Sequence, residues 1–161
     1  MGARRSQLIQ IAIAFQGLIS LMNEQREKVS KAASNEEESR YAQRTMVDIR
    51  DNLAGTEAAY ALFRPWLLTK KSSDPLRDGK SIDANIAAGF DKLAAAYAAV
   101  SADAFPIPPP TWSSESPSPD DLATPFGQLY SQVTSAVDPN DPSSVVAQMN
   151  DAAAALGLFG L

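Results

Sequence analysis

The sequence predicts an all-α protein, an up-and-down bundle of four to five helices with one proline-rich loop at residues 104–120. Apolar residues recur at steps of three and four along five stretches, which is the spacing of one face of an α-helix. No stretch carries a credible strand pattern. Because 161 residues suit one domain, we expect residues 1–161 to form a single helical bundle.

The first two helices are predicted to carry long apolar faces. The first should reach about Ala33, and Ser34 followed by Glu37 is typical of a capping box that begins the second. Gly55 indicates either a close approach by a neighbouring helix or a tolerated loss of stability, and Pro65 predicts a bend or break near the helix end. The first face comprises Leu8, Ile11, Phe15, Leu18 and Met22, and the second comprises Ala42, Met46, Ile49, Leu53, Thr56, Tyr60, Phe63 and Leu67.

Three further helices follow a polar connection at residues 70–80. Ser81 is a candidate cap of the third, and Ser118-Pro119 or Thr124-Pro125 is expected to begin the fourth. Asp141 with Pro142 should begin the last, which Gly157 should end. Their faces comprise Ile86, Phe90, Leu93, Tyr97 and Val100, then Leu122, Phe126, Leu129, Tyr130, Val133 and Val137, then Val145, Met149, Ala152, Ala153 and Leu156.

The stretch FPIPPPTWSSESPSP, residues 105–119, is incompatible with a helix because of its prolines. It is either an ordered segment held by Phe105, Ile107 and Trp112 or a mobile loop. We expect the ordered form, since three large apolar side chains would otherwise lie in water.

Composition excludes several function classes. The chain has 14 Lys and Arg against 19 Asp and Glu, and its net charge of -5 argues against nucleic acid as a partner. It has no cysteine and no histidine. This absence excludes four features within this chain: a disulfide, a thiolate nucleophile, a Ser-His-Asp triad and a zinc site of Cys/His type.

The N-terminus superficially resembles a signal peptide, because Arg4 and Arg5 precede an apolar stretch. Gln10 and Gln16 interrupt that stretch, and no small-x-small cleavage site follows before Asn23. We therefore expect a helix of the mature fold with no clear signal peptide, and no transmembrane segment.

Asp48 and Asp51 are the candidate metal ligands, with Glu37 as a third carboxylate. Asp48 and Asp51 are three residues apart and share one face of the second helix, so this pair suits an oxygen-ligand site for iron or calcium. The alternative is surface ion pairing with Arg44, Arg50 or another helix. Glu36, Glu37 and Glu38 point about 100° apart on a helix, which favours a role in capping and solvation over joint metal binding. No catalytic residue is predicted.

A ligand or partner surface is expected at Arg40, Tyr41, Arg44, Arg64 and Trp66. Its aromatic rings suit stacking on sugars, and its cations, with Lys70, suit an acidic polymer. The alternative is that the aromatic residues belong to the core or its rim.

The stretch EEESRYAQRTMVDIRDNLAGTEAAYALFRPWL, with QGLISLMNEQREKVSKA before it and MNDAAAALGL near the end, resembles the C-terminal half of the imelysin-like family. That family includes the insulin-cleaving membrane protease group (peptidase M75) and the EfeO-like iron-uptake proteins. The similarity runs from about Gln16 to Leu158. It implies a helical bundle of the bacterial periplasm or cell envelope that is linked to iron or haem acquisition. The family's Gly-x-His-x-x-Glu motif cannot be placed on this histidine-free chain.

Three functional hypotheses follow. The first is a non-catalytic binding or assembly module of the envelope, which forms a homodimer or joins a second helical bundle that supplies the missing half. Such a protein should expose an apolar strip, for instance along its first helix. The second is a relic or split M75-type metallopeptidase that uses the carboxylates of Asp48, Asp51 and residues 36–38. The third is a periplasmic binder of acidic or sugar polymers.

Overall fold

The computed structural model describes residues 2–34, 36 and 43–159. Within these ranges the chain forms six α-helices and one 3₁₀-helix, and it contains no strand. The all-α prediction is therefore confirmed. The helices are α1 (Gly2–Ala33), α2 (Thr45–Leu67), η1 (Pro75–Arg77), α3 (Gly79–Ala98), α4 (Pro119–Leu122), α5 (Pro125–Ala136) and α6 (Val145–Leu156).

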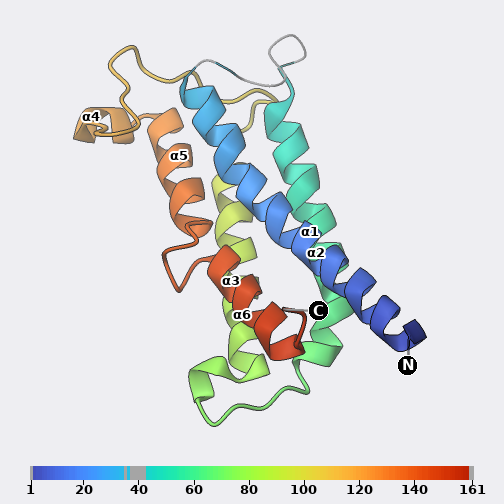
Figure 1. Ribbon diagram of the computed structural model, residues 1–161. Coiled ribbons are helices and arrows are strands. Elements are labelled where there is room, and N and C mark those ends of the chain that lie inside the picture. The colour runs from blue at the N-terminus through green and yellow to red at the C-terminus, as the bar shows by residue number, and fades with distance from the viewer. Residues whose placement is uncertain (1, 35, 37–42, 160–161) are drawn as a thin grey trace.

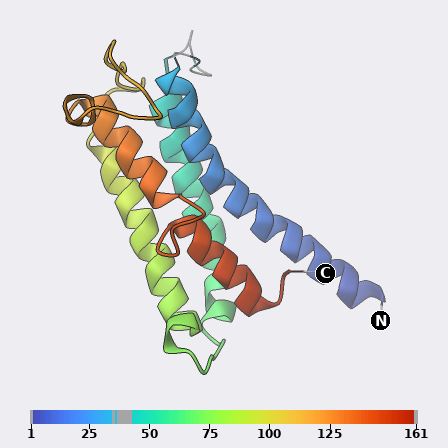
Figure 2. The same ribbon diagram turned by 60° about the vertical axis from the view of Figure 1, so that its left-hand side comes forward.

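The helices form four antiparallel arms, as predicted for an up-and-down bundle (Figure 1). Helices α1, α2 and α3 are the first three arms, and α5 and α6 follow one another along the fourth (Figures 1 and 2). Both α1 and α3 contact α2 on one side and the α5 and α6 arm on the other. Most of the expected faces fill the space between the arms, where Phe15, Ile49, Leu93, Phe126 and Met149 are fully buried. Leu8 was wrongly assigned to the buried face of the first helix, because it is 38% exposed.

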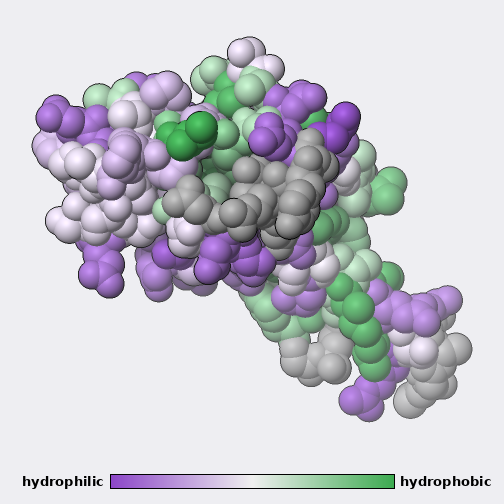
Figure 3. Space-filling model, turned by 90° about the horizontal axis from the view of Figure 1, so that it is seen from above, coloured by the Kyte–Doolittle hydropathy of each residue, from purple (hydrophilic) through white to green (hydrophobic). Residues whose placement is uncertain are grey.

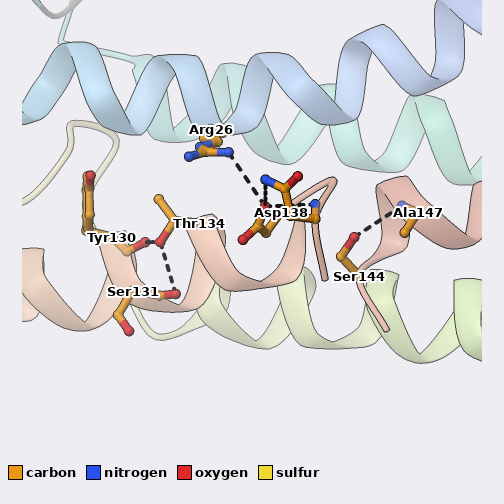
Figure 4. A network of polar contacts seen from close by, with 8 residues as sticks. Arg26, Tyr130, Ser131, Thr134, Asp138, Ser144 and Ala147 are labelled. Atoms are coloured by element: carbon orange, nitrogen blue, oxygen red, sulfur yellow. Dashed lines mark hydrogen bonds and ion pairs between the residues drawn. The ribbon is translucent and has the colours of Figure 1, made fainter. Parts of the chain in front are cut away.

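The fourth arm is broken at residues 137–144, where the DPNDP stretch ends α5. The Asp138 carboxylate accepts a hydrogen bond from the Asn140 backbone N–H at 3.0 Å and lies 3.9 Å from the Arg26 guanidinium of α1 (Figure 4). Helix α6 then packs closely on α3, since a Cβ added to Gly89 would lie 2.7 Å from the Val145 Cβ. The break lets two short helices cover α3 and α1 at different angles.

The helix starts differ from the predicted ones at three places. Ser34 does not begin α2, because its hydroxyl donates to the Ser30 and Lys31 carbonyls and so satisfies the end of α1. Helix α2 begins only at Thr45, and Glu37 lies outside the described residues. Asp78 rather than Ser81 caps α3, and Ser144 rather than Asp141 caps α6.

The other predicted helix signals were correct. Pro119 and Pro125 each stand at the start of a helix, α4 and α5, so both candidate positions are used. Gly157 ends α6 in the left-handed conformation, with φ of 72°. Pro65 lies inside α2, which ends two residues later at Leu67.

The proline-rich loop crosses the end of the bundle opposite the loop between α2 and α3 (Figures 1 and 2). Phe105 is buried, and the Trp112 ring packs edge-on against Phe126 and Tyr130 with centroids 4.9 Å apart in each case. Ile107 is 87% exposed, so the expectation that it helps to hold the loop was wrong. The Thr111 hydroxyl instead supplies the further link, donating to the buried Asp121 carboxylate at 2.5 Å.

The first turns of α1 project beyond the bundle, where the helix diverges from its neighbours (Figures 1 and 2). Arg5 to Leu8 are exposed, and the first buried side chain of α1 is Ala12. By length and hydropathy alone, residues Arg5–Ala33 would be enough to cross a membrane, and the absence of a transmembrane segment stays a prediction. Core helices of soluble proteins and signal sequences meet the same criterion.

Two glycines in helices should respond oppositely to alanine. A Cβ at Gly55 would meet nothing within 4 Å, so Gly55→Ala should raise the free energy of unfolding by about 0.5–1 kcal/mol through its better helix propensity. A Cβ at Gly79 would lie 2.0 Å from the Leu67 carbonyl oxygen, so Gly79→Ala should lower the free energy of unfolding by about 1–3 kcal/mol. Urea denaturation of both variants checks this, and a shift of the same sign in both would contradict it.

Candidate functional site at the basic end of the bundle

Positive charge concentrates where α2 ends and α3 begins. Residues 64–80 contain five Lys and Arg and only two Asp, a local net charge of +3 in a chain whose total is -5. We call this region the basic end and define it by Arg64, Lys70, Lys71, Arg77 and Lys80. Four of the five side chains are exposed, and Lys70 is half-buried.

The two acids in this region are used as caps. The Asp74 carboxylate accepts a hydrogen bond from the Leu76 backbone N–H at 3.0 Å, and the Asp78 carboxylate accepts one from the Lys80 N–H at 3.0 Å. The Lys80 N–H, together with the Lys71 ammonium, lowers the pKa of Asp78. Both carboxylates therefore face the backbone, and the cations project outward around them.

A buried carboxylate from α3 positions Arg64. Asp83 accepts a hydrogen bond from the Tyr60 hydroxyl at 3.0 Å, and the Arg64 Nε lies 2.9 Å from both of its oxygens. The Asp83 side chain is 7% exposed and that of Arg64 is 56% exposed. Pairing with Asp83 raises the pKa of Arg64, and burial, helped by the Asp83 charge, raises the pKa of Tyr60. The cluster fixes the base of Arg64 while the guanidinium remains at the surface.

A cavity of about 250 Å³ opens between the basic end and α6. The loop contributes Lys70, Lys71, Ser72 and Arg77 to its wall, α3 contributes Ile82, and α6 contributes Asp151, Ala154 and Ala155. The ion pairs here are long, 3.5 Å from Lys71 to Asp78 and 3.9 Å from Arg77 to Asp74, and the two cationic side chains are about 70% exposed. Such exposed pairs are weak, so these cations can turn to another anion at little cost.

The residues predicted to form one ligand or partner surface are divided by the structure. Arg64 and Trp66 lie at the basic end, where the Lys70 ammonium lies 5.1 Å from the centre of the Trp66 ring. Arg44 precedes the first residue of α2 and is therefore at the other end of that helix. Arg40 and Tyr41 lie outside the described residues. Arg44 therefore does not share a surface with Arg64 and Trp66.

The candidate metal ligands lie near the start of α2. Asp48 is half-buried and Asp51 is exposed, while Glu37 lies outside the described residues. Within the ranges that the structure describes, no three acidic side chains are grouped so that they could hold a metal ion. Arg50, a predicted ion-pair partner, donates instead to the carbonyls of Tyr97, Val100 and Ala102 at the end of α3. The metal site stays a prediction.

Sequence reasoning missed Asp83, although a signal for it exists. Asp83 precedes Ile86 by three residues, so it extends the apolar face of α3 backward by one turn. A carboxylate at such a position predicts a buried acid with a cationic or hydroxyl partner. Arg77 and Lys71 lie in the stretch predicted only as a polar connection, and the local net charge of residues 64–80 is the signal that singles them out.

Two more cavities lie along the contact of α3 with the fourth arm. One, of about 410 Å³, is lined by Lys92, Gln132, Asp141 and Ser144 among others. The other, of about 530 Å³, lies between it and the basic end and includes Asn85 and Gln148, whose amides are hydrogen-bonded at 3.1 Å. Neither cavity is lined by a buried polar side chain that lacks a hydrogen-bond partner.

Removing the Asp83 carboxylate should destabilise the hairpin of α2 and α3. Asp83→Ala leaves the buried Tyr60 hydroxyl without its acceptor, which should lower the free energy of unfolding by about 2 kcal/mol. Urea denaturation measures the change. The control is Asp91→Ala, at an exposed position of the same helix, which should change the free energy of unfolding by less than about 0.5 kcal/mol. Equal effects of the two variants would contradict this role of Asp83.

Alkali should unfold the protein through two buried tyrosines. Burial raises the pKa of Tyr60 and of Tyr97, whose hydroxyl donates to Gln25 at 2.8 Å. Above pH of about 10 the unfolded chain releases these protons and the folded chain keeps them, so stability falls as pH rises, by about 1.4 kcal/mol per pH unit for each tyrosine. Stability measured against pH should fall less steeply in Tyr97→Phe, and an unchanged slope would contradict the prediction.

The comparisons with known proteins agree with the helical architecture. The sequence model of the imelysin family, peptidase M75, matches residues 2–111. The match covers α1, α2, α3 and the first part of the proline-rich loop, and it includes the basic end and the Asp83 cluster. No curated protein and no solved structure is detectably similar to the chain. Since the match covers more than half of its residues, the chain belongs to the imelysin family.

Proposed function

We propose that this imelysin-family protein is a non-catalytic binding or assembly module of the bacterial envelope that acts in iron or haem uptake. The observation that carries the proposal is the absence of histidine and cysteine from all 161 residues. Without them the chain has no imidazole base, no thiolate nucleophile, and neither the imidazole nor the thiolate ligands that bind many transition metals. The envelope location and the link to iron come from the family resemblance.

Exposed apolar side chains on α1 and α2 support the proposed partner surface. Ile13 on α1 is 67% exposed and Leu62 on α2 is 81% exposed. Between these helices the Phe15 and Phe63 rings meet edge-on, with centroids 4.9 Å apart. An apolar strip along the first helix is what a protein that pairs with a second helical bundle should present. A second copy of this chain can supply that bundle, so we propose a homodimer.

The competing hypotheses have less support. A metallopeptidase would need Asp48, Asp51 and the glutamates at residues 36–38 to converge on one ion. Glu37 and Glu38 lie outside the described residues, and among the described side chains Asp48 and Asp51 form no metal-binding group with a third acid. If the protein cleaved unfolded substrates and the variant Asp48→Asn did not, the metallopeptidase hypothesis would be restored. A binder of acidic or sugar polymers would use Arg44 together with Arg64 and Trp66, which lie at opposite ends of α2.

Native mass spectrometry, alone and with iron or calcium salts, tests the proposal because it reports assembly and metal stoichiometry together. We expect a dimer without metal, which the double variant Ile13→Ser, Leu62→Ser should convert to a monomer. Ile107→Ser is the matched control, since Ile107 is exposed in the proline-rich loop. A monomer that binds one metal ion tightly, and loses it in Asp48→Asn, would overturn the proposal and assign a metal site to Asp48.

A further inference from the structure

The basic end also exposes apolar side chains. Leu76, in η1 at the middle of the loop between α2 and α3, is 78% exposed. Phe159, three residues after the end of α6, is 50% exposed, and Leu8 near the start of α1 is 38% exposed. Large apolar side chains in water are unfavourable, and an exposed leucine flanked by cations, as at Leu76, indicates an interaction surface.

Leu76 is held outward by a well-ordered loop. The Asp74 carboxylate caps η1 through the Leu76 N–H, and the Ser81 hydroxyl donates to the Pro75 carbonyl at 2.8 Å. The Gly79 N–H donates to the Lys70 carbonyl at 3.2 Å, which closes the loop at its base. These bonds fix the backbone on both sides of Leu76, so its exposure is built into the loop.

Lys70, Lys71, Arg77 and Lys80 surround this leucine in the sequence. The two nearby acids, Asp74 and Asp78, are engaged by backbone N–H groups, and their ion pairs with Arg77 and Lys71 are long and exposed. Long cationic side chains can reach lipid phosphates while an apolar neighbour enters the acyl region. The loop therefore combines both elements of an interfacial anchor.

The first turns of α1 supply a second contact at the same end. In both ribbon views the loop between α2 and α3 and the start of α1 are the two parts of the molecule that project farthest at this end (Figures 1 and 2). The projecting part of α1 carries hydrophobic and hydrophilic surface side by side at the lower right of Figure 3. Exposed Arg5 and Leu8 give it the same pairing of cation and apolar side chain.

From this arrangement we propose that the basic end docks on the surface of a bilayer that contains anionic lipids, with Leu76 and Leu8 entering the interface and Lys70, Lys71 and Arg77 contacting lipid phosphates. The inference goes beyond the proposed function and needs neither the dimer nor the role in iron uptake. A soluble acidic polymer would use the cations alone. The exposed leucines at the two projections favour the bilayer over such a polymer, because a bilayer offers them an apolar environment and a soluble polyanion does not.

Co-sedimentation with vesicles of phosphatidylglycerol and phosphatidylcholine in equal parts tests the proposal. We expect binding that weakens with salt and is far weaker on phosphatidylcholine alone. The double variant Lys70→Gln, Lys71→Gln should bind the vesicles that contain phosphatidylglycerol at least about tenfold more weakly. The variant Leu76→Ser should bind them about tenfold more weakly. The matched controls are Lys92→Gln, at an exposed position within α3, and Ile107→Ser, in the loop at the other end, and both should bind as the unaltered protein does.

Circular dichroism of each variant establishes that it is folded before binding is compared. Equal binding to the two kinds of vesicle would overturn the proposal, and so would unchanged binding by Leu76→Ser. Binding to soluble dextran sulfate that depends on Lys70 and Lys71, without vesicle binding, would assign the basic end to an acidic polymer instead. None of these outcomes depends on the oligomeric state, so the dimer proposal can fail or hold independently.

Discussion

The arrangement of the basic end depends on the buried carboxylate of Asp83. A carboxylate removed from water must be paired, and here the Tyr60 hydroxyl and the Arg64 guanidinium from the neighbouring helix satisfy it. This requirement sets the register of α2 against α3. The close approach of Gly79 to the Leu67 carbonyl then turns the chain sharply between the two helices. The position of the loop, and with it the display of Leu76 and its flanking cations, follows from these two contacts.

Much of the fold can be predicted from the sequence because it depends on local periodicity. The faces of α2 and α3 were predicted at the positions that the core buries, from Met46 to Leu67 and from Ile86 to Tyr97. Helix starts were harder, since several capping residues compete at each one. Ser34, Ser81 and Asp141 are good caps in isolation, yet each side chain bonds to another group nearby in the sequence instead. Ile107 was misplaced because an apolar residue in a loop need not be buried.

The candidate site was predicted only in part. Arg64 and Trp66 were singled out as residues of a ligand or partner surface, and Trp66 lies against Lys70, which lines a cavity. Joining them to Arg44 was an error, because twenty residues of helix separate the two arginines and place them at opposite ends. Asp83 is nineteen residues from Arg64 in the sequence, and only the packing of α2 on α3 brings the two together. Contacts between helices were thus the part that periodicity could not supply.

The proline-rich loop has a consequence for the unfolded chain. Six of the 11 prolines lie within residues 105–119, and each fixes one backbone angle whether or not the protein is folded. The unfolded chain therefore has fewer conformations to lose here than in an ordinary connection of equal length. This long segment between α3 and α5 can be ordered by a few anchors, the Trp112 ring and the Thr111 hydroxyl among them, because most of its stiffness is already present in the polypeptide before it folds.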